Sequence, residues 1–231
     1  MNPIVNPIVK RLIQIGLLVL IQAVALFGAV WRLNWVEGWA YLGLYLAFIA
    51  LNAVLMLSKP GSVELIKERS QIKENAKGWD KVIGLLFGLF GPGMLIVAGF
   101  DERWGWSPRL AVAVQVAAFV VVALGDVLFA WAMASNKFFS SVVRIQQDRG
   151  HTVQMGGPYH FVRHPGYVGT IVPALATPLA LGSLWAFIPA GLLTVVIVVR
   201  TALEDKTLRR ELPGYEEYAQ RTSYRLLPGV W

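Results

Sequence analysis

Long apolar blocks separated by short polar stretches dominate this chain. A membrane-spanning helix needs about 20 consecutive apolar residues, and four blocks meet that length. They cover roughly Leu12–Trp31, Trp39–Leu57, Val82–Phe100 and Leu110–Ala134. The pattern therefore predicts four transmembrane helices in the first part of the chain.

A fifth apolar region, Val168–Val199, is too long for one comfortable span. Three prolines and Gly182 interrupt it, and Leu181-Gly182-Ser183 has the composition of a tight turn. We therefore predict a helical hairpin here. The expected fold is an all-α integral membrane protein of about six transmembrane helices, of which the last two form the hairpin.

No linker, repeat or low-complexity tract divides the sequence, so we expect one membrane domain over residues 1–231. Residues 1–134 would hold the four N-terminal spans. Residues 135–231 would hold the longest polar loop, the hairpin and a C-terminal amphipathic helix, with a helix end at Pro213-Gly214. Within the polar stretch 58–81, Val63–Arg69 is typical of a short amphipathic helix on the membrane surface.

Composition agrees with a membrane protein: 56% of the residues are hydrophobic and only 15% are charged. Soluble domains contain about 25% charged residues. The chain has no cysteine, which excludes disulfides, thiolate catalysis and cysteine-ligated metals. The three histidines lack the spacing of a metal site, so we expect no metal.

The basic residues predict the orientation. With six spans, only three of the 21 Lys and Arg residues fall on one side, namely Arg32, Arg103 and Arg109. Positive residues concentrate on the cytoplasmic side of membrane proteins, so both termini are expected in the cytoplasm. A single fifth span would place the basic tail outside. The net charge of +7 then reflects topology and contact with anionic membrane lipid, not nucleic acid.

The densest polar segment next to the membrane is Gly156–Tyr167, which contains two histidines, one arginine and two tyrosines between glycines and prolines. Polar side chains at such a place are costly, so a functional site is the first hypothesis. Pro158 and Pro165 restrict the backbone around Arg163, whose planar fork suits a carboxylate or phosphate. The alternative is a headgroup loop whose arginine and histidines only reach toward the interface.

A second polar group follows the predicted hairpin. Arg200 and Glu204 lie four residues apart, so they share one helix face, and Asp205 is next to them. The plain alternative is an ion pair that marks where the helix leaves the membrane. Both polar groups emerge on the same predicted side, where they can meet and form one pocket.

Two further features are weighed against this pocket. Asp126 is an acidic residue about midway along the fourth span, where a carboxylate faces a partner or a cavity, or is simply a hydrogen-bonded structural residue. Its depth places it too far from the cytoplasmic side for a direct role. Gly91-Pro92-Gly93 follows no strand, so it is a helix kink or a close-packing site and not a dinucleotide loop.

The second half of the chain resembles the isoprenylcysteine carboxyl methyltransferase family and its phospholipid methyltransferase relatives. The resemblance rests on two motifs, their order and the hairpin between them. The Asn136–His151 stretch is typical of bacterial members. The matching positions are Gly157-Pro158-Tyr159, Arg163–Gly169, Arg200, Glu204, Asp205, Leu208, Leu212–Tyr215, Tyr218 and Arg225–Pro228.

This resemblance implies an integral membrane methyltransferase that uses S-adenosylmethionine and acts on a lipophilic or prenylated acceptor. Arg163, Arg200 and Glu204 would be the catalytic residues, with the two arginines holding an anionic acceptor group. The site would lie on the cytoplasmic side of a bacterial inner membrane. The cofactor-binding residues implied are Pro158, Tyr159, His164, Pro165, Tyr167, Glu204 and Asp205.

Two other classes stay open at this point. Membrane reductases of the sterol type share a similar architecture with an Arg-His-Pro-like loop, but they bind NADPH. A non-catalytic lipid-binding membrane protein would not require both motifs. Binding of S-adenosylmethionine distinguishes the first class from these two.

Overall fold

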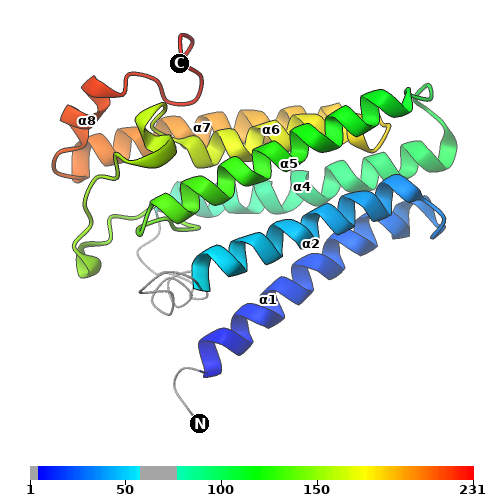
Figure 1. Ribbon diagram of the computed structural model, residues 1–231, viewed down its shortest axis with the longest axis horizontal. Coiled ribbons are helices and arrows are strands. Elements are labelled where there is room, and N and C mark those ends of the chain that lie inside the picture. Colours follow the sequence, from blue (N-terminus) through cyan, green and yellow to red (C-terminus); the bar gives the residue numbers. More distant parts are fainter. Residues whose placement is uncertain (1–4, 58–76) are drawn as a thin grey trace.

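The computed structural model describes residues 5–57 and 77–231, and every regular element in those ranges is helical (Figure 1). The predicted surface helix at Val63–Arg69 lies outside the described residues. The elements are α1 Val5–Ala23, followed directly by the π-helical turn η1 Val24–Gly28, then α2 Val36–Leu57, α4 Gly78–Trp104, α5 Val112–Ser135, η2 Gln147–Arg149, η3 Gly157–His160, α6 Pro165–Ala180, α7 Phe187–Glu211 and α8 Tyr215–Arg221.

The all-α membrane architecture is confirmed. Five helices in the described ranges are long and apolar enough to cross a membrane: α1 with η1, α2, α4, α5 and α7. The predicted hairpin is also present, because α6 and α7 are joined by a turn at residues 181–186. Helix α6 has only 16 residues, which is shorter than a full span, so the count of six spans stays a prediction.

Helices α5 and α6 approach closely because glycine removes side-chain bulk from their contact. A Cβ on Gly125 would lie 2.4 Å from Cδ of Pro173, and one on Gly169 would lie 2.6 Å from the backbone nitrogen of Phe129. Small residues at helix contacts are the usual way in which membrane helices pack. This packing fixes the start of α6, and therefore the loop before it, against the end of α5.

At one end of the bundle, a buried carboxylate ties two connections together. Asp101 accepts hydrogen bonds from the Ser107 backbone N–H (2.7 Å) and from the hydroxyls of Ser107 (2.6 Å) and Ser183 (2.5 Å). The α4–α5 connection and the α6–α7 turn therefore lie at the same end. Arg32 pairs with Glu102 there as well, so the three basic residues predicted to share one side do cluster.

The opposite end carries the 136–164 loop and the C-terminal segment after α7 (Figure 1). Helix α7 ends at Glu211, close to the predicted stop, and α8 follows in the predicted C-terminal region. Gly91 and Gly93 lie within the continuous helix α4, and a Cβ on either would meet nothing within 4 Å. This segment is therefore not the close-packing site that was one of its two expected roles.

Candidate active site

The loop before α6 is shaped by its glycine and prolines. Gly157 has a φ of +62°, and a Cβ there would lie 2.5 Å from the Ser135 hydroxyl, so glycine suits the position on both counts. Pro158 stands at the start of η3, and Pro165 at the start of α6, where its missing N–H costs nothing. These constraints present Tyr159, Arg163 and His164 toward α7.

A cavity of about 360 Å³ lies between this loop, the end of α5, the 136–154 segment and α7. It brings together the two polar groups that the sequence places about 35 residues apart. Six of the predicted site residues line it, namely Tyr159, Arg163, His164, Tyr167, Arg200 and Glu204. Pro158, Pro165 and Asp205 are buried outside its lining.

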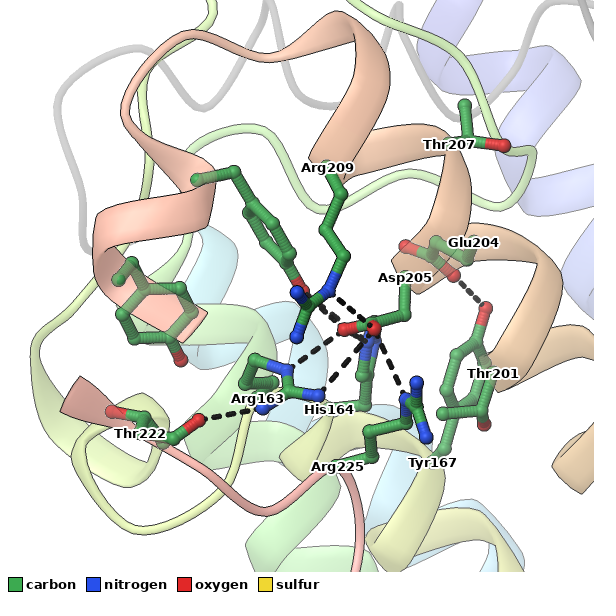
Figure 2. A network of polar contacts seen from close by, with 12 residues as sticks. Arg163, His164, Tyr167, Thr201, Glu204, Asp205, Thr207, Arg209, Thr222 and Arg225 are labelled. Atoms are coloured by element: carbon green, nitrogen blue, oxygen red, sulfur yellow. Dashed lines mark hydrogen bonds and ion pairs between the residues drawn. The ribbon is translucent and has the colours of Figure 1, made fainter. Parts of the chain in front are cut away.

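Asp205 is the centre of a buried network rather than a wall of the cavity (Figure 2). Arg163 donates to it from Nε at 2.8 Å and from Nη2 at 3.4 Å. Its other donors are Arg209 Nε at 3.2 Å, Arg225 Nε at 3.0 Å and the Tyr215 hydroxyl at 3.1 Å. His164 Nε2 lies 3.4 Å away. A buried carboxylate is stable only when it is paired and hydrogen-bonded in this way.

The same network attaches the C-terminal segment to the loop. Arg163 Nη1 donates to the carbonyls of Thr222 (2.7 Å) and Ser223 (2.8 Å). The Arg163 N–H donates to the Tyr224 carbonyl at 2.9 Å, and the His164 N–H to that of Arg225 at 3.0 Å. The planar fork of Arg163 is thus directed at groups of the protein itself.

Arg200 is held in a comparable way from the first half of the chain. Its Nε and Nη2 lie 2.9 and 3.1 Å from the two carboxylate oxygens of Asp80, which is in the first turn of α4. Its guanidinium also lies 5.7 Å from the ring centre of Phe87 and 5.6 Å from that of Tyr167. The third arginine of the cavity wall, Arg144, pairs with Asp148 at 3.0 Å.

Glu204 differs from these aspartates. It is half-buried, lines the cavity and accepts a short hydrogen bond from the Tyr167 hydroxyl (Figure 2). Within the described part of the chain it forms no ion pair. The cavity therefore has three arginines that each have a carboxylate partner, and one carboxylate whose partner among residues 5–57 and 77–231 is a neutral donor.

Burial keeps three tyrosines near the cavity, and His151 of the loop, neutral. Burial raises the pKa of Tyr159, Tyr215 and Tyr218 above the ordinary value, so their hydroxyls remain protonated. Burial lowers the pKa of His151, and the nearby Arg144 and Arg149 act in the same direction. The Nδ1 of His151 then accepts the Gln146 backbone N–H at 3.2 Å.

Several polar residues of the site escaped the sequence reasoning, and Asp80 and Asn136 are two examples. Asp80 lies in the polar stretch just before a predicted span, and nothing local distinguishes it from a helix-start acid. Asn136 donates from Nδ2 to the Tyr159 hydroxyl at 3.3 Å and lines the cavity.

No group of three or more His, Asp or Glu in the described ranges could hold a metal ion. The exposed His160 does not line the cavity.

This geometry agrees with a family match. Residues 116–210 match the isoprenylcysteine carboxyl methyltransferase (ICMT) family, a range that includes the loop, the hairpin, Arg200 and Glu204. This segment, less than half of the chain, is similar to the ICMT family.

Similar proteins include a protein-S-isoprenylcysteine O-methyltransferase of Schizosaccharomyces pombe, 36% identical over 30% of this chain and 30% of the relative. A probable protein-S-isoprenylcysteine O-methyltransferase of Oryza sativa is 28% identical over 47% of this chain and 58% of the relative. A Delta(14)-sterol reductase of Mus musculus is 32% identical over 42% of this chain and 24% of the relative. Each match covers less than two thirds of the relative's own length.

Proposed function

We propose that this protein is a membrane methyltransferase that binds S-adenosylmethionine in the cavity and methylates a lipophilic acceptor. The observation that carries the proposal is the charge arrangement of the cavity. Arg144, Arg163 and Arg200 are each paired with an aspartate, whereas Glu204 accepts from the Tyr167 hydroxyl and forms no ion pair among the described residues. Such a cavity favours a cationic ligand, and the sulfonium of S-adenosylmethionine is one.

The residues present fit this cofactor. A cavity of about 360 Å³ is within the common range for ligand sites of about 300–1,000 Å³. Aromatic faces attract cations, and Tyr159, Tyr167 and Tyr215 line the cavity with Glu204. We assign His164 to the same wall. Pro158, Pro165 and Asp205 would act by shaping the loop and holding Arg163 and His164, since they do not line the cavity.

When bound, S-adenosylmethionine supplies a methyl group, which passes to a nucleophile of the acceptor while the electron pair of the broken bond stays on sulfur. The protein's part is to align the two molecules and to exclude water. Arg163 and Arg200 are both fixed by carboxylates, so they would keep the cavity walls in a defined position. An acceptor carboxylate needs no proton removed, so it requires no general base from the protein. We assign Arg200, which lines the cavity, as the residue that would hold that carboxylate.

The acceptor side of the cavity is apolar. Phe87 of α4, Phe129 of α5 and Phe139 of the loop line it. We propose that a lipid-like chain of the acceptor packs against these rings. Two relatives are named for isoprenylcysteine, so a prenylated cysteine is the first acceptor that we propose to test.

We further propose that the protein resides in a bacterial inner membrane, with both termini and the site in the cytoplasm. The support is the distribution of basic residues: Arg32, Arg103 and Arg109 are the ones near the Asp101 end. All other Lys and Arg residues of the described ranges lie toward the cavity end, as the positive-inside rule predicts for a cytoplasmic face.

The alternative is an NADPH-dependent reductase, which the similarity to a Delta(14)-sterol reductase keeps open. NADPH is strongly anionic and its phosphates need cationic partners. The three cavity arginines already have carboxylate partners, which favours the methyltransferase. A lipid-binding protein without catalysis is the remaining alternative.

Calorimetric titration of the purified, detergent-solubilised protein with S-adenosylhomocysteine and, separately, NADPH tests the three classes. Micromolar binding of the first alone supports a methyltransferase, and binding of NADPH alone supports a reductase. If neither ligand binds, the result supports a lipid-binding membrane protein without catalysis. Transfer of a radiolabelled methyl group to N-acetyl-S-farnesylcysteine then tests the acceptor class.

A further inference from the structure

Asp80 does not line the cavity itself, but it contacts two residues that do, Arg200 and Val143. Its side chain is 1% exposed, and both of its oxygens accept from the Arg200 guanidinium, 120 residues further along the chain. It also accepts the Val143 backbone N–H at 2.8 Å. Asp80 lies outside residues 116–210, the segment that matches the ICMT family.

These contacts determine how Arg200 is oriented. Its Nε and Nη2 face Asp80, and Nη2 also donates to the Ser141 carbonyl at 2.9 Å. Its plane lies against the rings of Phe87 and Tyr167. Its Nη1 has no hydrogen-bond partner among the described residues. One edge of the guanidinium is thus fixed by the protein, at a residue that lines the cavity.

Asp80 also balances the charge of Arg200. A guanidinium beside Tyr167 and Glu204 would repel a cation and would offset the negative charge of Glu204. Charge interactions in such a partly buried place are several times stronger than in water. With Asp80 in place, the pair is neutral and Glu204 keeps its attraction for a positive ligand.

We propose that Asp80 is a positioning and charge-balancing residue that allows this site to accept a sulfonium cation. The inference rests on the proposed function. It predicts that Asp80 affects charged S-adenosylmethionine more than S-adenosylhomocysteine, whose sulfur is neutral. A residue that only joins α4 to α7 would change both affinities alike.

The test compares the two affinities by calorimetry in one detergent for the unmodified protein, Asp80→Asn, Arg200→Met and the double variant. In Asp80→Asn we expect S-adenosylmethionine to lose about tenfold more affinity than S-adenosylhomocysteine, as an unbalanced positive charge nearby would cause. Arg200→Met should shift the ratio of the S-adenosylmethionine affinity to the S-adenosylhomocysteine affinity in the opposite direction. The double variant should return it near the original, because the pair is again neutral.

Asp101→Asn is the matched control. Asp101 is a second buried, hydrogen-bonded aspartate of α4, but it lies at the other end of the bundle. Its substitution should leave the ratio unchanged. If Asp80→Asn does not fold, Arg200→Met and the double variant still decide, since their ratios are predicted to differ.

Equal losses for both ligands in Asp80→Asn, or a double variant no closer to the original ratio than the single ones, would overturn the role of Asp80 while leaving the proposed function standing. Failure of the unmodified protein to bind either ligand would instead overturn the proposed function, and the inference with it.

Discussion

Arg163 Nε lies 2.8 Å from Oδ1 of Asp205, although the two residues are 42 positions apart in the chain. Both side chains are almost fully buried, at 2% and 1% exposure. The pair joins the loop before α6 to α7, and the tail joins it through Arg225. The arginine that the sequence offers as a ligand for an anion therefore already has an anion, supplied by the protein.

Asp205→Asn should destabilise the protein strongly. It leaves Arg163 as a buried charge without a carboxylate, and breaking one partner of a buried ion pair costs about 3–5 kcal/mol. We expect a large drop in the unfolding temperature measured in detergent. Arg209→Gln is the control, because Arg209 is 34% exposed and such pairs contribute about 0–1 kcal/mol. Equal effects of the two substitutions would contradict the buried network.

Glu204→Gln should weaken S-adenosylmethionine binding by at least about tenfold and abolish methyl transfer, because it removes the unbalanced negative charge of the cavity. Expression and the unfolding temperature should stay near those of the unmodified protein. The matched control is Glu211→Gln on the same helix, since Glu211 pairs with Lys77 and does not line the cavity. Normal turnover in Glu204→Gln would remove Glu204 from the site.

Gly169→Ala should lower stability by about 1–3 kcal/mol, the usual cost of overpacking a close contact. The added Cβ would lie 2.6 Å from the backbone nitrogen of Phe129, and a backbone cannot move aside easily. The control is Gly88→Ala, where nothing lies within 4 Å and alanine favours the helix. Thermal unfolding in detergent compares the two, and a Gly88→Ala loss as large would refute the close approach of α5 and α6.

Asp126→Asn should leave S-adenosylhomocysteine affinity within about twofold, a change of less than about 0.5 kcal/mol. Asp126 lies in the middle of α5 and does not line the cavity. Calorimetry on the purified variant measures this directly. Complete loss of binding or turnover would show that this carboxylate acts on the site from a distance.

The architecture follows from local composition. Apolar block lengths predict α2, α4 and α5 to within a few residues, because a membrane requires spans of a set length. The first block, Leu12–Trp31, ends close to the end of η1, but α1 already begins at Val5. The α6–α7 hairpin follows from its prolines and Gly182, which interrupt an apolar run too long for one helix. The basic residues predict which connecting loops lie at the same end of the bundle, because the positive-inside rule depends only on the sequences of those loops.

The two polar motifs, with their six cavity residues from Tyr159 to Glu204, and the family resemblance also follow from the amino-acid sequence alone. The ion-pair partners of these residues become visible only in the three-dimensional packing. Asp80 pairs with Arg200, which lies 120 residues further along the chain. Asp205 does not line the cavity and instead accepts hydrogen bonds from Arg163 and Arg225. Buried charges must find partners wherever packing brings them, and no spacing along the chain reveals which partner that is.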